Sequence, residues 1–200
     1  TMSGLQLIPL TIGIVTTSTL AGIYMGKTGR YTLLAKFGMV LLALGGIATT
    51  LLTKDTSVLR FSVTILLIGL GMGFIFPILS TAVQNAVPKS QLGTATAAPI
   101  LFRQIGGSLA VSAFGAIFVS RMGTAMTSSG IDMGPISISE LGPQSMAIIP
   151  QDMRGVVGDA VVFALHPSYW IITCLAIIGI GFAFKLHEIP LSNRKVAKSE

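Results

Sequence analysis

Charged side chains are scarce in this sequence. Only 10% of its 200 residues are Asp, Glu, Lys or Arg, whereas about 25% is usual for a soluble domain. Hydrophobic residues make up 52% of the chain. The low charge excludes an ordinary soluble globule, and the high hydrophobicity excludes an intrinsically disordered chain.

Cysteine and histidine are almost absent. The single cysteine, Cys174, excludes a disulfide framework and a multi-thiolate metal site. The two histidines, His166 and His187, flank the last apolar run and are too far apart to share a metal ion. No His-Glu-x-x-His, no Walker lysine and no locatable Ser/His/Asp group occurs. We therefore expect neither an enzyme nor an ATP-driven transporter, and neither a metal nor another cofactor.

Long uncharged apolar runs occupy most of the chain. A helix needs roughly 20 mostly apolar residues to cross a bilayer. The fold class that follows is an all-α polytopic membrane protein with five transmembrane helices. We predict these spans over residues 4–25, 33–53, 61–84, 94–119 and 167–186. They leave a loop at 120–166, in which we expect short interfacial helices near 143–147 and 152–165, and a tail at 187–200.

The formal net charge of +6 could suggest a nucleic-acid ligand, but membrane proteins collect Lys and Arg in their cytoplasmic loops. If the loop after the first span is cytoplasmic, eight basic residues lie inside: Lys27, Arg30, Lys36, Lys89, Lys185, Arg194, Lys195 and Lys198. Four lie outside: Lys54, Arg60, Arg121 and Arg154. We therefore expect a multi-pass protein of the plasma membrane with an extracytoplasmic 120–166 loop, a cytoplasmic C-terminus, the lipid bilayer as partner and no nucleic acid.

A tight basic turn is predicted between the first two spans, because its glycines permit close backbone approach and positive φ. Its spacing resembles motif A of the major facilitator superfamily, Gly-x-x-x-Asp-Arg-x-Gly-Arg-[Arg/Lys]-x-x-Leu. The matching positions are Gly22, Lys27, Gly29, Arg30 and Leu34. Gly26 stands where the motif has its acid, and Tyr31 stands in place of the second basic residue.

A second block sharpens the resemblance. It comprises Gly69-Leu-Gly71-Met-Gly73-Phe-Ile-Phe-Pro77, Gln84-Asn85-Ala-Val-Pro88, Gly93-Thr-Ala95-Thr-Ala97 and Phe102-Arg103-Gln104-Ile-Gly106-Gly107-Ser108. Together these segments resemble the C-terminal half of the fourteen-span drug/proton antiporters, the EmrB/QacA family. The resemblance implies an incomplete C-terminal half-bundle of a proton-coupled multidrug efflux antiporter. Such a transporter exports small amphipathic or cationic compounds by alternating access, and its N-terminal half would be a missing partner.

Glycines and one proline suggest close helix packing in two spans. Gly69 and Gly73 lie four residues apart, a spacing that lets membrane helices approach closely, and Gly106-Gly107 gives the fourth span a similar character. Pro77 frees a backbone carbonyl one turn after Gly73. This segment is either a hinge or gate helix or a simple packing surface.

Arg103 is the one charged residue in the interior of a predicted span, since Lys36 and Lys185 lie close to the ends of theirs. An ionised group there costs several kcal/mol unless it is paired or hydrated. It either snorkels or hydrogen-bonds for structural reasons, or it is a cavity or gate residue whose counter-charge lies on helices outside this chain. Softer cavity or gate candidates, each with packing as the alternative, are Gln104, Gln84, Gln6, Thr17 and Pro77.

Acidic residues are absent from all five predicted spans. Coupled transport needs a membrane-embedded proton acceptor, so the chain is not expected to pump by itself. The first span begins close to Thr1, and for this reason we expect a fragment of a longer transporter. The rival hypothesis is a truncated, non-transporting five-helix membrane protein with a structural or assembly role.

Overall fold

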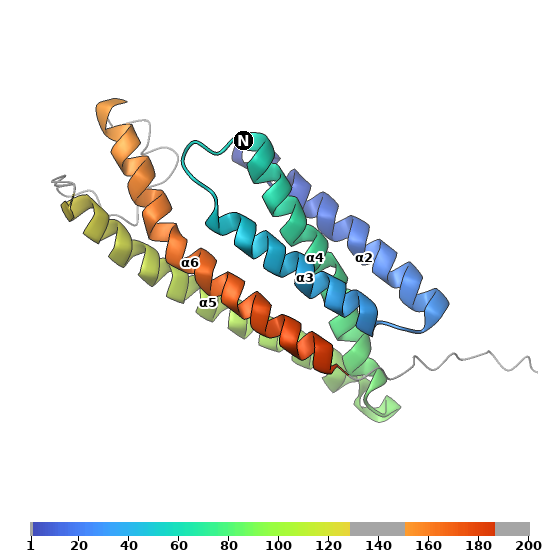
Figure 1. Ribbon diagram of the computed structural model, residues 1–200. Coiled ribbons are helices and arrows are strands. Elements are labelled where there is room, and N and C mark those ends of the chain that lie inside the picture. Colours follow the sequence, from blue (N-terminus) through green and yellow to red (C-terminus); the bar gives the residue numbers. More distant parts are fainter. Residues whose placement is uncertain (1, 129–150, 187–200) are drawn as a thin grey trace, which may run out of the picture.

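The computed structural model describes residues 2–128 and 151–186 as a bundle of long helices (Figure 1). The elements are α1 (Met2–Leu5), α2 (Ile8–Thr28), α3 (Thr32–Thr50), α4 (Val58–Asn85), the 3-10 turn η1 (Lys89–Gln91), α5 (Leu92–Ser128) and α6 (Gln151–Lys185). The described part contains no strand, and five of its helices are long and apolar enough to cross a membrane. The predicted all-α class is thereby confirmed.

Two helices extend beyond the predicted spans. α5 continues past residue 119 to Ser128, and α6 begins at Gln151 rather than near Pro167. The loop predicted at 120–166 is therefore helical at both of its ends. The helix expected over 152–165 is part of α6, whereas the one expected near 143–147 and the 187–200 tail lie outside the described residues.

Packing explains why these polar ends stay helical. Met122 and Met126 of α5 are buried against Val157, Ala160 and Ala164 of α6. The residues on each helix repeat at intervals of three or four, so a buried stripe runs along both helices outside the uncharged runs. A search for apolar runs overlooks such a stripe, because Ser, Thr, Arg and Gly lie between its members.

The helices follow one another across the bundle in the order α2, α4, α3, α6 and α5, with α4 between α2 and α3 (Figure 1). The α2–α4 contact is close because glycines form it. A Cβ added to Gly13 of α2 would lie 2.9 Å from the carbonyl oxygen of Leu66. Gly69 packs on the backbone of Leu10, and Gly73 packs on Ile14 and Thr17. Close backbone approach through small residues is the usual basis of helix association in membranes.

The turn between α2 and α3 is built on a left-handed glycine. Gly29 has φ 66°, and its N–H donates to the carbonyl of Met25 at 2.9 Å. An L-residue with a side chain is disfavoured in this conformation. Two residues later Tyr31 is 1% exposed and packs with Ala21 and Ile78. The turn is thus anchored in the core of the bundle.

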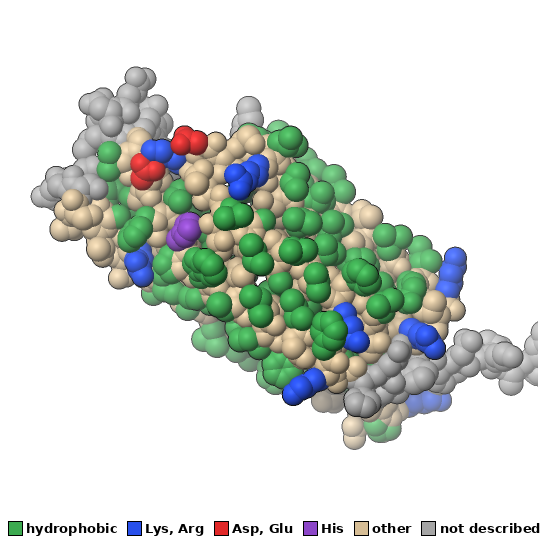
Figure 2. Space-filling model, in the orientation of Figure 1, with side chains coloured by type: hydrophobic (Ala, Val, Ile, Leu, Met, Phe, Trp, Pro, Cys, Tyr) green, Lys and Arg blue, Asp and Glu red, His purple; other side chains and the backbone are tan. Residues whose placement is uncertain are grey.

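Charges separate to the two ends of the bundle (Figure 2). The basic end carries Lys27, Arg30, Lys36, Lys89 and Lys185, and within residues 2–128 and 151–186 it holds no Asp or Glu. The opposite end carries Lys54, Asp55, Arg60, Arg121 and Asp159. These Lys and Arg residues thus form the two groups that the sequence predicts. Which side of the membrane each group faces stays a prediction.

Candidate functional site

The candidate site lies along the contact between α4 and α5, which run antiparallel after a short connection through η1. The carboxamide nitrogen of Gln84 on α4 donates a hydrogen bond to the hydroxyl of Thr96 on α5 at 3.1 Å. The Thr96 hydroxyl donates in turn to the carbonyl of Leu92 at 2.8 Å. This short chain of hydrogen bonds fixes the two helices relative to each other near the basic end.

Farther along the same contact, Arg103 of α5 places its guanidinium 5.2 Å from the ring centroid of Phe76 on α4. Cations are attracted to the faces of aromatic rings, so this contact holds the side chain toward α4. Arg103 lies about 16 Å along α5 from Leu92, at 1.5 Å per residue. It makes no ion pair with any residue that the structure describes.

Pro77 follows Phe76 and lies inside the continuous helix α4. Because proline has no N–H, the carbonyl of Gly73 receives no helical hydrogen bond from residue 77. Gly73 also packs against α2, so the interrupted turn coincides with a close contact between α2 and α4. Gln84 and Arg103 therefore both make contacts between α4 and α5, and Pro77 adjoins the ring that Arg103 contacts.

The middle of α5 contacts little else within the described chain. Every residue from Ile100 to Leu109 is exposed, with Phe102 at 75%. Gln104 belongs to this surface. A Cβ added to Gly106 or Gly107 would meet no heavy atom within 4 Å, so these glycines form no helix contact in the described part. The small size of these glycines predicts a packing role, but it does not show which helix would pack on them.

Thr17 does not join this site. It is 3% exposed, and its hydroxyl donates to the carbonyl of Gly13 at 2.8 Å within its own helix. It packs against Gly73 of α4. In the described part Thr17 therefore packs between α2 and α4, which was the alternative to its predicted cavity role.

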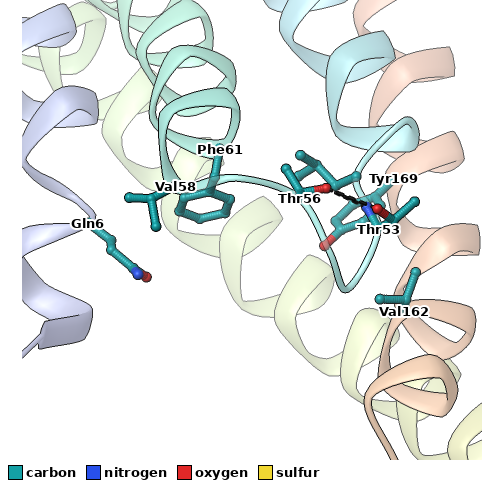
Figure 3. A pocket seen from close by; sticks show the side chains of 8 residues that line it. Gln6, Thr53, Thr56, Val58, Phe61, Val162 and Tyr169 are labelled. Atoms are coloured by element: carbon teal, nitrogen blue, oxygen red, sulfur yellow. Dashed lines mark hydrogen bonds between the residues drawn. The ribbon is translucent and has the colours of Figure 1, made fainter. Parts of the chain in front are cut away.

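Gln6 lies at the other end of the bundle, far from Arg103 along the helices. It borders a pocket of about 270 Å³ between the start of α4, the loop before it, and α6 (Figure 3). Thr53, Thr56, Phe61 and Tyr169 line the same pocket. The backbone N–H of Thr53 donates to the hydroxyl of Thr56 at 2.7 Å, which shapes the loop. The predicted cavity residues therefore do not form one cluster. Gln6 lies at the end of the bundle opposite the basic end, Thr17 lies between α2 and α4, and the others lie on α4 and α5.

The residues that resemble motif A form the turn at the basic end. Lys27 and Arg30 are exposed, and the backbone N–H of Arg30 donates to the hydroxyl of Thr28 at 3.2 Å. Gly22 is also exposed, and a Cβ there would meet nothing within 4 Å. Gly29 supplies the left-handed conformation of the turn.

One electrostatic contact was not foreseen from the sequence. The ammonium of Lys54, in the α3–α4 loop, lies 2.6 Å from a carboxylate oxygen of Asp159 on α6. Hydrogen bonding to Asp159 raises the pKa of Lys54 above its ordinary value of 10.5. The two residues are 105 positions apart, so only the folding of α6 onto α3 brings them together.

The described carboxylates do not enter the apolar middle of the bundle. Asp55 lies in the α3–α4 loop, and Asp159 lies near the start of α6 with its side chain 61% exposed. Among the described side chains, Arg103 is therefore the charged residue farthest from the ends of α4 and α5. No described carboxylate lies beside it to accept a proton.

Comparison with known proteins extends over nearly the whole chain. It is 30% identical over 197 residues to an uncharacterized MFS-type transporter of Mycobacterium tuberculosis (strain H37Rv), a match that covers 96% of the chain. The similarity to MFS-type transporters supports membership of the major facilitator superfamily. The chain is also 29% identical over 220 residues to the multidrug transporter protein MdtP of Bacillus subtilis, with 96% of the chain covered. It is 31% identical over 175 residues to the MFS-type efflux pump MMF1 of Mycosarcoma maydis, with 86% covered.

These relatives are much longer than the chain. It spans 28% of the Mycobacterium tuberculosis and Mycosarcoma maydis proteins and 40% of MdtP. No family model matches it.

Proposed function

We propose that the chain is the C-terminal part of a proton-coupled efflux transporter of the fourteen-span EmrB/QacA family. The complete protein would export small amphipathic or cationic compounds from the cell by alternating access. The observation that carries the proposal is the match, along 96% of the chain, to relatives that include a named multidrug transporter. A relative named as a tetracycline resistance determinant, from Streptomyces rimosus, matches 62% of the chain.

The open surface of α5 supports a partner made of further helices. Its middle exposes Phe102, Leu109 and two adjacent glycines, and the relatives contain about two to four times the length of this chain. We assign this surface to the N-terminal half of the same transporter, encoded outside residues 1–200. Glycines there would permit close approach of a neighbouring helix.

Arg103 is then a gate residue. A guanidinium repels cationic compounds, so its partner would be a carboxylate of the N-terminal half rather than a cationic substrate. Its contact with Phe76 keeps it beside Pro77, where α4 lacks one helical hydrogen bond. A change in the pairing of Arg103 would thereby act on the turn of α4 that lacks a helical hydrogen bond.

The proton acceptor would also belong to the other half, because the described side chains place no carboxylate in the apolar middle. Gln84 and Gln104 would lie near the substrate path, and the turn with Lys27 and Arg30 would face the cytoplasm. The positive-inside rule supports this orientation, with a cytoplasmic C-terminus in the plasma membrane.

The same lack of carboxylates favours a second candidate, a non-transporting membrane protein with a structural or assembly role. Expression of residues 1–200 alone and of the complete reading frame, each in cells lacking endogenous efflux pumps, separates the two. We expect proton-gradient-dependent ethidium efflux from the complete reading frame and none from residues 1–200. Absence of efflux from both, with normal membrane insertion, would favour the structural role.

A further inference from the structure

A groove of about 790 Å³ opens at the end of the bundle opposite the basic end. One wall is a single face of α6, formed by Asp159, Phe163, His166 and Trp170. Their spacing of four, three and four residues keeps them on one side of a helix. The other lining residues include Lys54 and Asp55 from the α3–α4 loop and Arg121 from α5. We call these seven residues the α6 groove.

The α6 groove changes character along its length. Asp159 marks its charged end, and Trp170 lies about 16 Å farther along the helix, at 1.5 Å per residue. Trp170 is 54% exposed and stands where the uncharged apolar run of α6 has begun. Tryptophan favours the membrane–water interface, so this wall passes from the headgroup region toward the acyl chains. The groove therefore matches a lipid molecule in both its polar and its apolar part.

Two charged side chains of the groove, one cation and one anion, are available to bind a ligand. Lys54 and Asp159 form an ion pair, with 2.6 Å between the ammonium nitrogen and a carboxylate oxygen. Arg121 stacks its guanidinium over the ring of Phe163, 5.4 Å from the centroid, and it makes no ion pair with any described residue. Asp55 likewise makes no ion pair within the described ranges 2–128 and 151–186. A zwitterion complements this arrangement better than a ligand of either single charge.

We propose that the α6 groove binds one molecule of phosphatidylethanolamine. The planar guanidinium of Arg121 has donors suited to phosphate oxygens, and the carboxylate of Asp55 accepts hydrogen bonds from the primary ammonium. The first part of an acyl chain lies along Phe163 and Trp170. A choline headgroup cannot donate hydrogen bonds to Asp55, and the glycerol headgroup of an anionic lipid has no cation to offer it. The site is independent of the transport proposal, since it requires only a protein embedded in a bilayer.

Binding to delipidated full-length protein in detergent tests the proposal. Native mass spectrometry would compare phosphatidylethanolamine, phosphatidylcholine and phosphatidylglycerol with identical acyl chains. We expect the wild type to bind phosphatidylethanolamine about tenfold more tightly than either of the others, the effect of one charge-assisted hydrogen bond. Asp55→Asn should abolish the preference over phosphatidylcholine, and Arg121→Gln should weaken binding of all three lipids.

The exposed Lys89 at the basic end gives a matched control, because Lys89→Gln removes one surface charge far from the groove. It should leave all three affinities unchanged. Equal binding of the three lipids by the wild type would overturn the proposal, as would a preference for phosphatidylglycerol. Unchanged selectivity in Asp55→Asn, an exposed loop variant that should fold normally, would overturn it as well.

Discussion

The guanidinium of Arg103 on α5 lies 5.2 Å from the ring centroid of Phe76 on α4, and Pro77 follows that ring directly in the chain. The deepest charge on these two helices is therefore coupled to the turn of α4 that lacks a helical hydrogen bond. This coupling gives the proposed gate a specific structural basis.

Replacing Arg103 should impair transport without impairing insertion. We expect Arg103→Ala in the full-length protein to lower ethidium efflux about tenfold, the factor that corresponds to roughly 1.4 kcal/mol in a rate-limiting barrier. Arg103→Lys keeps the charge but loses the planar donors, so it should recover only part of the rate. Arg60→Ala, an exposed arginine at the opposite end, serves as control and should transport normally. Undiminished efflux in Arg103→Ala, at equal expression, would remove the gate role.

The glycine contacts between α2 and α4 predict a steric effect on stability. Gly69→Val should lower the free energy of unfolding by about 1–3 kcal/mol, a usual cost of overpacking, because its side chain would meet the backbone of Leu10. Gly181→Ala on α6 provides the comparison, since its Cβ would meet nothing within 4 Å. The control should be neutral or slightly stabilising, because alanine favours helix more than glycine does. Thermal unfolding in detergent measures both variants, and an equally stable Gly69→Val protein would contradict the packing described here.

The Lys54–Asp159 pair predicts a dependence of stability on pH. The pKa of Lys54 is higher in the folded protein than its ordinary value of 10.5, so the charged lysine favours the folded state. Its contribution is fully present below that ordinary value and is lost as the pH rises through the raised pKa. The difference in melting temperature between wild type and Lys54→Met should therefore be constant from pH 7 to 9 and shrink above about pH 10.5. A difference that persists unchanged at the highest pH would show that Lys54 acts by packing alone.

The hydrogen bond between Gln84 and Thr96 should contribute a small coupling energy between α4 and α5. A double-mutant cycle with Gln84→Leu and Thr96→Val is expected to give about 0.6 kcal/mol, the average for such bonds between membrane helices. Ser112→Ala supplies a control, because among the described residues that hydroxyl donates to the carbonyl of Ser108 in its own helix. Additive effects of the two α4–α5 variants would mean that the helices are held together by other contacts.

The sequence sufficed to predict the number and class of the long helices, because uncharged runs of that length have few alternatives in a folded protein. It did not suffice for the ends of α5 and α6. Those ends depend on Met122 and Met126 meeting Val157 and Ala164, which form a stripe at helical spacing rather than an uncharged run.

The candidate site was predictable only in part. The depth of Arg103 follows from its position in an apolar run, but its contact with Phe76 depends on the register between α4 and α5. Thr17 stands beside Thr16 and Ser18 in α2, and the sequence does not reveal which of these polar residues faces α4. The Lys54–Asp159 pair depends likewise on how α3 and α6 pack.

The central claim is that this chain forms one part of a proton-coupled exporter. The most direct test is transport by the purified full-length protein, reconstituted in liposomes with an imposed pH gradient. We predict ethidium movement that follows the direction of the gradient, stops when an ionophore collapses it, and is about tenfold slower in Arg103→Ala. Ethidium movement that ignores the gradient, or no movement by protein correctly inserted in the liposomes, would contradict the account.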